Sequence, residues 1–238
     1  MLEAIDILYS YPDGPFALRG VSFSISPGEI VGLIGENGAG KTTLIKCLFG
    51  LYKPDDGSVL VDGESGERTR EQLAYVSGQG ASFSLYTPLE AGEFLAEFYP
   101  RFEMEKYRRL LRFFELPDRP VRHMSTGQRA QAELAAGFCR GTAYILMDEP
   151  FANKDAFTRQ DFLKLMAGGL GDEQAILLST HLIQEAEPVI SRALILHEGR
   201  IARDIDMEEL RESGQTLLDI FAQVTGYDPK RAARLFAQ

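Results

Sequence analysis

The chain has 238 residues, of which 45% are hydrophobic and 25% are charged, and its formal net charge is −10. This length suits one α/β core domain that carries an additional lobe. The acidic balance disfavours nucleic acid as a partner, because proteins that neutralise phosphate backbones usually carry a basic face. The apolar runs are short core strands, far below the roughly 20 residues that cross a bilayer. Any membrane role must therefore come from a partner.

Two cysteines, Cys47 and Cys139, lie in apolar helical surroundings without disulfide or metal-ligand spacing. We expect both to be small buried residues, as in proteins of the reducing cytosol. The sequence starts without a basic segment followed by an apolar one, so no secretory leader is expected.

The predicted elements begin with a strand at Ile30–Ile34, a Val- and Ile-rich run between two glycines. A helix is expected over Thr43–Phe49, where a glycine then ends it. Turn residues bracket a short strand at Ser58–Val61, and a further strand is expected at Leu73–Ser77.

A helical block follows from Leu89 to about Leu116, and a second helix is predicted over Thr126–Phe138. Apolar side chains in the first segment recur at spacings of three and four, which indicates one buried helix face: Met104, Tyr107, Leu110, Leu111 and Phe114. We expect this block, about residues 87–138, to form an inserted helical lobe.

Strand and helix signals alternate again after the lobe. The expected elements are a strand at Tyr144–Met147, a helix at Asp155–Met166, and strands at Ile176–Ser179 and Leu194–His197. Such alternation implies a parallel core sheet. The tail, residues 207–238, is predicted to hold two or three short helices.

The segment Gly35–Thr42 matches the pattern G-x-x-x-x-G-K-[ST] at every constrained position. Its glycines allow successive backbone N–H groups to face phosphate oxygens, and the following helix adds its positive end. Lys41 supplies a cation for the β- and γ-phosphates, and the Thr42 hydroxyl is a hard ligand for Mg²⁺. The predicted nucleotide-binding residues here are Gly35, Asn37, Gly38, Gly40, Lys41, Thr42 and Thr43. A chance glycine-rich turn is the alternative, which the strand–loop–helix order disfavours.

Two acids, Asp148 and Glu149, end the predicted strand Tyr144–Met147. The carboxyl end of a parallel strand faces the same crevice as the phosphate loop. Asp148 is therefore expected to hold Mg²⁺ and Glu149 to polarise the attacking water. If these two acids are considered without the phosphate loop, the alternative is an ordinary acidic strand end with no catalytic role.

The peptide Met124-Ser125-Thr126-Gly127-Gln128 resembles the signature Leu-Ser-Gly-Gly-Gln of one ATPase family. Together with the phosphate loop and the acidic strand end, it makes the chain similar to the ATP-binding subunit of an ABC transporter over nearly its whole length. The resemblance implies a P-loop NTPase fold: an α/β domain with a mainly parallel core sheet, an N-terminal antiparallel β subdomain and the helical lobe. The ATPase domain would span residues 1–206.

The resemblance also implies roles for individual residues. Ser125, Thr126, Gly127 and Gln128 would cap the γ-phosphate of ATP bound by the opposite protomer. Gln79 would contact Mg²⁺ or the attacking water, and His181 the γ-phosphate. Tyr11 would stack on adenine. Asp155 would lie on the dimer seam, where Asn153 and Lys154 depart from the family's usual residues.

The function implied is ATP hydrolysis with Mg²⁺ that powers transport. The partners would be a second ABC ATPase subunit, identical or different, and integral membrane permease subunits, with the chain held on the cytoplasmic face of the membrane. The tail segment Thr216–Phe221 resembles the C-terminal helix of ATPases that serve export-type permeases. The alternatives are a soluble ABC-type ATPase with a non-transport role, a P-loop small-molecule kinase, and a module that holds ATP without turnover.

Overall fold

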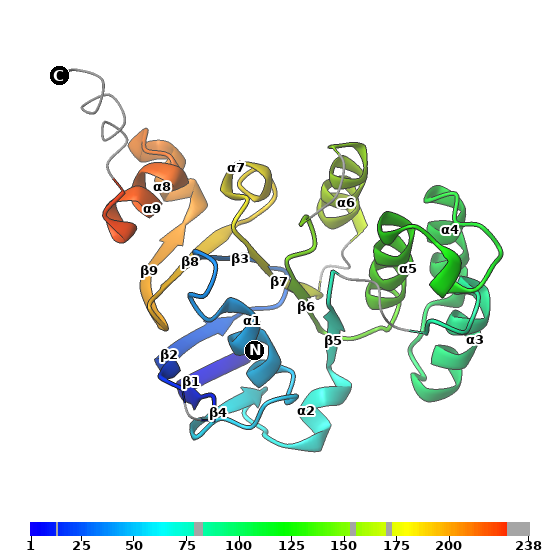
Figure 1. Ribbon diagram of the computed structural model, residues 1–238, viewed down its shortest axis with the longest axis horizontal. Coiled ribbons are helices and arrows are strands. Elements are labelled where there is room, and N and C mark those ends of the chain that lie inside the picture. The colour runs from blue at the N-terminus through cyan, green and yellow to red at the C-terminus, as the bar shows by residue number, and fades with distance from the viewer. Residues whose placement is uncertain (13, 79–82, 153–155, 170–172, 228–238) are drawn as a thin grey trace.

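The computed structural model describes residues 1–12, 14–78, 83–152, 156–169 and 173–227 (Figure 1). Within these ranges no helix has the length and apolar character needed to span a membrane.

The N-terminal sheet has the order β2-β1-β4, with strands β1 (Leu2–Ser10), β2 (Phe16–Ile25) and β4 (Asp56–Val61). Both neighbours of β1 run antiparallel to it. The antiparallel N-terminal subdomain is therefore confirmed, and β4 begins two residues before the predicted strand. Alternate side chains point into the core, as on a sheet with one covered face.

The second sheet has the order β5-β6-β7-β3-β8-β9. Its strands are β3 (Ile30–Ile34), β5 (Leu73–Val76), β6 (Tyr144–Asp148), β7 (Ala175–Thr180), β8 (Arg192–His197) and β9 (Arg200–Asp206). All neighbours are parallel except β8 and β9, which form an antiparallel pair at the edge. This confirms the mainly parallel core sheet. Because β7 lies between β3 and β6, the carboxyl ends of these three strands are adjacent.

Helix α1 (Lys41–Leu48) lies between the two sheets. Its apolar side chains Leu44, Ile45 and Leu48 belong to one core cluster with residues of both sheets. The helix begins two residues earlier than the sequence predicts, because the glycine before Lys41 adopts the left-handed conformation that starts it.

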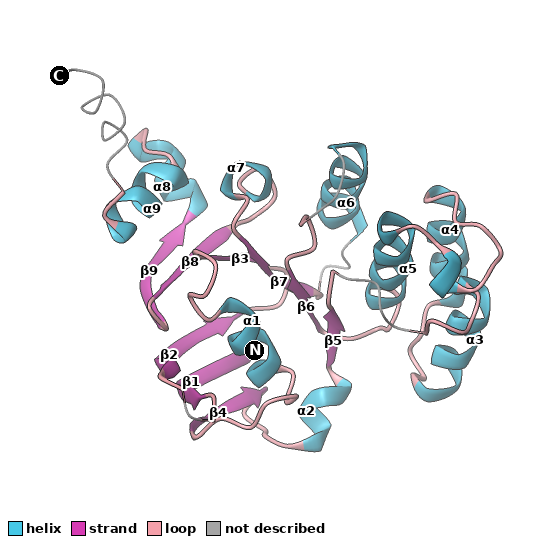
Figure 2. Ribbon diagram, in the orientation of Figure 1, coloured by secondary structure: helices cyan, strands magenta, loops and turns pink. Residues whose placement is uncertain are grey.

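The helical lobe gathers at one end of the molecule (Figure 2), with α3 (Pro88–Phe98), α4 (Met104–Phe113), the short η1 (Val121–His123) and α5 (Thr126–Phe138). The segment predicted as helical from Leu89 to Leu116 is two helices. Tyr99 leaves α3 with extended backbone, since it precedes Pro100 and the residue before a proline disfavours the helical region.

The remaining helices are α2 (Glu67–Glu71), α6 (Ala156–Gly169), α7 (Ile183–Ala186), α8 (Met207–Ser213) and α9 (Leu217–Thr225). Helices α8 and α9 form the described part of the tail, as the sequence predicts. Each ends at a glycine in the left-handed conformation, Gly214 and Gly226. Helix α9 packs on α7 and β8.

Both cysteines are buried and free, as expected. Burial raises the pKa of the Cys47 thiol to about 12 and that of Cys139 to about 12. Each is therefore a protonated core residue at neutral pH, without the thiolate that oxidation and alkylation require.

Packing between α3 and α4 leaves no room for a side chain at Gly92. A Cβ there would lie 2.2 Å from a ring carbon of Tyr107, which is buried and whose hydroxyl donates to the Pro88 carbonyl at 2.7 Å. We expect Gly92→Ala to lower the free energy of unfolding by about 1–3 kcal/mol, the usual effect of overpacking.

Thermal unfolding measures this effect. Gly168→Ala in α6 is the matched control, because a Cβ there would have no heavy atom of the described residues within 4 Å apart from its chain neighbours and its own helix backbone. Equal melting temperatures for the two variants would contradict the close packing of α3 on α4.

Candidate nucleotide-binding site

The phosphate loop joins β3 to α1, and close neighbours or backbone conformation require glycine at three of its positions. A Cβ on Gly35 would lie 2.5 Å from the carbonyl oxygen of Leu196. Gly40 has a φ of +108°, and a Cβ there would lie 2.7 Å from the carbonyl oxygen of Ala17. Gly38, with a φ of +85°, needs glycine for its backbone conformation alone.

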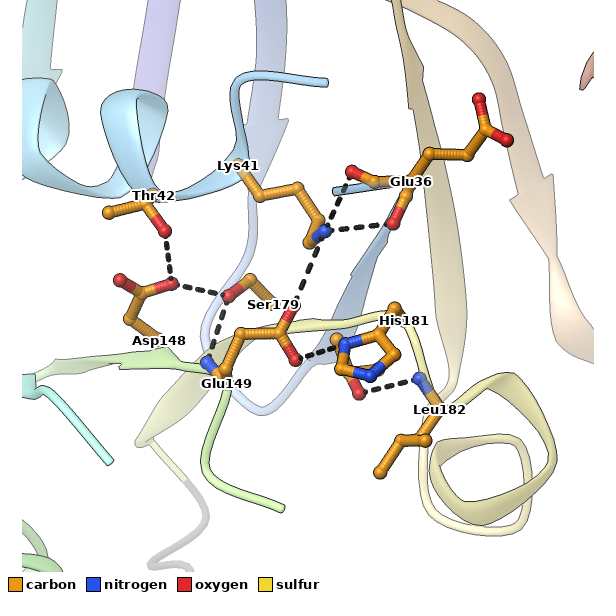
Figure 3. A network of polar contacts seen from close by, with 10 residues as sticks. Glu36, Lys41, Thr42, Asp148, Glu149, Ser179, His181 and Leu182 are labelled. Atoms are coloured by element: carbon orange, nitrogen blue, oxygen red, sulfur yellow. Dashed lines mark hydrogen bonds and ion pairs between the residues drawn. The ribbon is translucent and has the colours of Figure 1, made fainter. Parts of the chain in front are cut away.

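Lys41 is buried at the start of α1 with its ammonium fully partnered (Figure 3). The Nζ atom donates to the carbonyl oxygens of Gly35 at 2.8 Å and Glu36 at 3.0 Å. It also lies 3.2 Å from Oε1 of Glu149. A buried cation needs such partners, and phosphate oxygens are acceptors of the same kind.

Asp148 sits at the end of β6 and receives two hydroxyl groups on one oxygen. Thr42 donates to its Oδ1 at 3.0 Å, and Ser179 of β7 donates to the same atom at 2.9 Å. Hydroxyl and carboxylate oxygens in this position suit Mg²⁺, which is usually held by one or two protein ligands together with substrate phosphates.

Glu149 follows β6 with a φ of 50°, a left-handed conformation that costs a non-glycine residue roughly 1–2 kcal/mol. Its backbone N–H is held by Ser179, whose carbonyl oxygen lies at 3.1 Å and whose hydroxyl lies at 3.0 Å. The other carboxylate oxygen, Oε2, lies 2.9 Å from Nδ1 of His181, which follows β7. The strained backbone thus turns the carboxylate toward both Lys41 and His181 (Figure 3).

A cleft of about 440 Å³ lies beside these residues, although Gly35, Asp148 and Ser179 are not among those that line it. Nine of the predicted site residues line it: Tyr11, Asn37, Gly38, Gly40, Lys41, Thr42, Thr43, Glu149 and His181. Tyr11 is at its edge, 42% exposed, and its hydroxyl hydrogen-bonds to that of Thr43 at 3.0 Å. The cleft therefore offers a cation, hydroxyl groups and glycine backbone together with an aromatic ring, a combination that suits a nucleoside triphosphate.

The signature peptide begins α5, and Ser125 and Gln128 form a reciprocal capping box there. Ser125 Oγ accepts from the Gln128 N–H at 3.2 Å, and Gln128 Oε1 accepts from the Ser125 N–H at 3.1 Å. Thr126 is in the first helical turn and its hydroxyl accepts from Arg129 at 3.2 Å. None of the four residues Ser125–Gln128 is among those that line the cleft.

Two predicted site residues, Gln79 and Asp155, lie outside the described residues, as do Asn153 and Lys154. The segment just before Gln79 is described. A Cβ on Gly78 would lie 2.7 Å from the carbonyl oxygen of Asp148, so the chain leaves β5 against the acidic strand end.

Ser179 is a site residue that none of the sequence motifs contains. It is fully buried and joins the backbone of Glu149 to the carboxylate of Asp148. The signal available in the sequence was a hydroxyl residue at the end of a predicted buried strand, where a polar side chain is unusual.

The fold and the cleft together define the class: an α/β P-loop nucleotide-binding protein with two acidic residues beside its phosphate loop. Residues 18–152 match the family model of the ABC transporter. The chain belongs to this family, as an ATP-binding subunit with ATPase activity, which confirms the resemblance inferred from its motifs.

Relatives and a solved structure agree with this assignment. The chain is 30% identical to the ABC-type transporter ATP-binding protein EcsA of Bacillus subtilis, over 96% of this chain and 98% of the relative. A structure described as the ATP-binding subunit of an ABC transporter is similar with a TM-score of 0.84 and 30% identity, covering 94% of this chain and 99% of that one.

The names of other relatives cover both directions of transport. One is the phosphonates import ATP-binding protein PhnC 1 of Natronomonas pharaonis, 34% identical over 79% of this chain and 86% of the relative. Another is the lipopolysaccharide export system ATP-binding protein LptB of Acidithiobacillus ferridurans, 30% identical over 84% of this chain and 88% of the relative.

Ser179 gives the site its sharpest test. Ser179→Ala removes one of the two hydroxyl donors to Asp148 and one acceptor for the Glu149 N–H, so we expect kcat/KM for ATP to fall about tenfold, equivalent to roughly 1.4 kcal/mol. Steady-state phosphate release measures it. Ser26→Ala, at an exposed serine in the turn before β3, is the control. Wild-type kinetics in Ser179→Ala would show that this serine does not contribute to ATP turnover.

Proposed function

We propose that this ATPase subunit binds ATP with Mg²⁺ in the cleft, closes as a dimer around two ATP molecules, and powers transport through separate membrane subunits. One observation carries the hydrolysis step: the Glu149 carboxylate lies between the ammonium of Lys41 and the imidazole of His181. A base beside two phosphate-binding groups is the arrangement that attack on a γ-phosphate needs.

The mechanism follows from these contacts. The β- and γ-phosphates take the place of Glu149 as partners of Lys41, which leaves the carboxylate free to accept a proton from water. The water oxygen attacks the γ-phosphorus, the bond to the bridging oxygen breaks, and ADP departs with the electron pair. His181 donates a hydrogen bond to the γ-phosphate. Bound Mg²⁺ would be held by Thr42 and Asp148 and would supply positive charge to the phosphate oxygens.

The signature peptide supports the dimer. Glycine lowers helix stability, by up to about 1 kcal/mol relative to alanine, and no described residue of this chain requires it at Gly127. A Cβ there would meet only Ser125 Oγ, at 3.9 Å. We infer that a second subunit approaches this position and that Ser125–Gln128 cap the γ-phosphate bound by that subunit. Thr126 is compatible with this role, since its backbone is ordinary helix.

An exposed aromatic face on the lobe supports the membrane partner. Tyr86, Phe94 and Phe98 are 41%, 37% and 64% exposed. The rings of Phe94 and Tyr86 lie 5.8 Å apart, and those of Phe94 and Phe98 lie 4.7 Å apart. Connected aromatic side chains at a surface are typical of protein–protein interfaces. We propose that a cytoplasmic segment of the permease docks on this face, which holds the subunit at the inner side of the membrane.

The export direction that we propose rests on the tail. Thr216 caps α9 through a reciprocal capping box with Asp219, so the segment that resembles export-type ATPases forms a defined helix. Ile220, Phe221 and Val224 pack it onto the main core.

Glu149→Gln tests the hydrolysis step. The amide accepts no proton, so we expect ATP turnover to fall by about 10²–10⁴-fold, while ATP holds the variant as a dimer. Phosphate release and size-exclusion chromatography with light scattering measure the two effects. Hydrolysis at the wild-type rate would refute Glu149 as the base.

Lys41→Ala is the companion variant. It removes the phosphate-binding cation, and we expect weak ATP binding and no ATP-induced dimer. If calorimetry shows unchanged affinity for ATP, the phosphate-loop assignment is wrong.

The membrane partner has a separate test. If a polytopic membrane protein is encoded beside this gene, Phe94→Ser with Phe98→Ser should abolish co-purification with it, while the ATPase activity of the isolated subunit remains. Phe113→Ser, at an exposed phenylalanine on α4, is the control. Absence of such a neighbouring gene, or full retention by the double variant, favours a soluble ABC-type ATPase with a non-transport role.

A further inference from the structure

Two tyrosines at the end of β1, Tyr9 and Tyr11, and a third that follows α1, Tyr52, form one cluster beside the cleft. Tyr9 stacks on Tyr52 with ring centroids 5.2 Å apart and an interplanar angle of 7°. Tyr11 meets both rings edge-on, at 5.2 Å from Tyr9 and 6.1 Å from Tyr52. Only Tyr11 lines the cleft, so the other two form a layer behind it.

Tyr52 is fixed to helix α1 by three contacts with one residue, Lys46. Its backbone N–H donates to the Lys46 carbonyl oxygen at 3.1 Å. The Lys46 ammonium donates to the Tyr52 hydroxyl at 3.4 Å and lies 5.1 Å from the centre of its ring. Stacked and edge-on aromatic contacts and a cation over a ring are all favourable, and the Tyr52 ring makes each of them.

The same helix also holds Tyr11, through the hydroxyl contact with Thr43. Thr43 is two residues after Lys41, at the phosphate end of α1, whereas Lys46 lies near the other end of the helix. The ring at the edge of the cleft is therefore attached to the phosphate-binding helix at its hydroxyl and braced from behind by Tyr52 and Tyr9. This arrangement sets the distance between the flat face of the Tyr11 ring and the phosphate loop.

We propose that Tyr52 is a positioning residue for recognition of the nucleotide base: through Tyr9 and its own edge contact it fixes the ring of Tyr11, on which the base stacks. This inference rests on the proposed binding of ATP in the cleft. Bracing lowers the ordering cost of a partly exposed ring when the base binds. Tyr52 itself does not touch the nucleotide.

The test distinguishes the contribution of the nucleotide base to binding from the contribution of the phosphates. The full chain is titrated with ATP and with tripolyphosphate, each with Mg²⁺, in a calorimeter. We expect Tyr52→Leu to weaken ATP binding about fivefold, the equivalent of one aromatic contact, and to leave tripolyphosphate binding unchanged. Tyr52→Phe keeps the ring and should bind ATP almost as wild type. Tyr227→Leu, at an exposed tyrosine of the tail, is the matched control.

A double-mutant cycle guards against a general structural effect. If Tyr52 acts through Tyr11, Tyr52→Leu adds nothing to the loss of ATP affinity caused by Tyr11→Leu. Unchanged ATP affinity in Tyr52→Leu, an equal loss for ATP and tripolyphosphate, or additive losses in the cycle would each overturn the proposal. Failure of the wild-type chain to bind either compound would instead overturn the proposed function.

Discussion

The burial of one positive charge organises this site. The Lys41 ammonium is almost completely removed from water, and a cation in that position is stable only with acceptors around it. Two carbonyl oxygens of the phosphate loop and the carboxylate of Glu149 fill this role. Glu149 can do so because its strained backbone is held by Ser179 of the neighbouring strand. Lys41 thus joins the loop to Glu149 after β6, and Glu149 joins both to the end of β7.

Local patterns were sufficient to predict much of the fold. The strand Ile30–Ile34 and the helix Thr126–Phe138 have the bounds that the sequence predicts, because each is delimited by a glycine turn or a capping serine. The parallel core followed from the alternation of elements. The division of the lobe helix before Pro100 could have been predicted from the proline, whereas β9 pairs only at a sheet edge and carries mixed exposure, which leaves a weak pattern.

The candidate site also has one part that the sequence predicts and another part that it does not. The residues of the phosphate loop and the acidic strand end have a fixed spacing in the sequence, so their types and order identify them. Ser179 and Tyr52 act through contacts that depend on which strands are neighbours and on how α1 lies between the sheets. No local pattern carries that information. The position of the signature away from the cleft likewise depends on the arrangement of the lobe, since Ser125 begins a helix that packs on β5.

The attachment of α5 has a mechanical consequence. Near its carboxyl end the helix touches β5 so closely that a Cβ on Gly137 would lie 2.5 Å from Val76. The Ser77 hydroxyl, just beyond the strand, donates to the Glu133 carboxylate and lies 2.9 Å from each of its oxygens. The helix has 13 residues and so spans about 20 Å. Its carboxyl-terminal half is thus fixed to β5, and Ser125 stands at the other end of the helix. A rotation of about 10° there displaces the far end by about 3 Å, roughly the length of a hydrogen bond. A small tilt at the sheet would therefore move Ser125 by the difference between a made and a broken hydrogen bond.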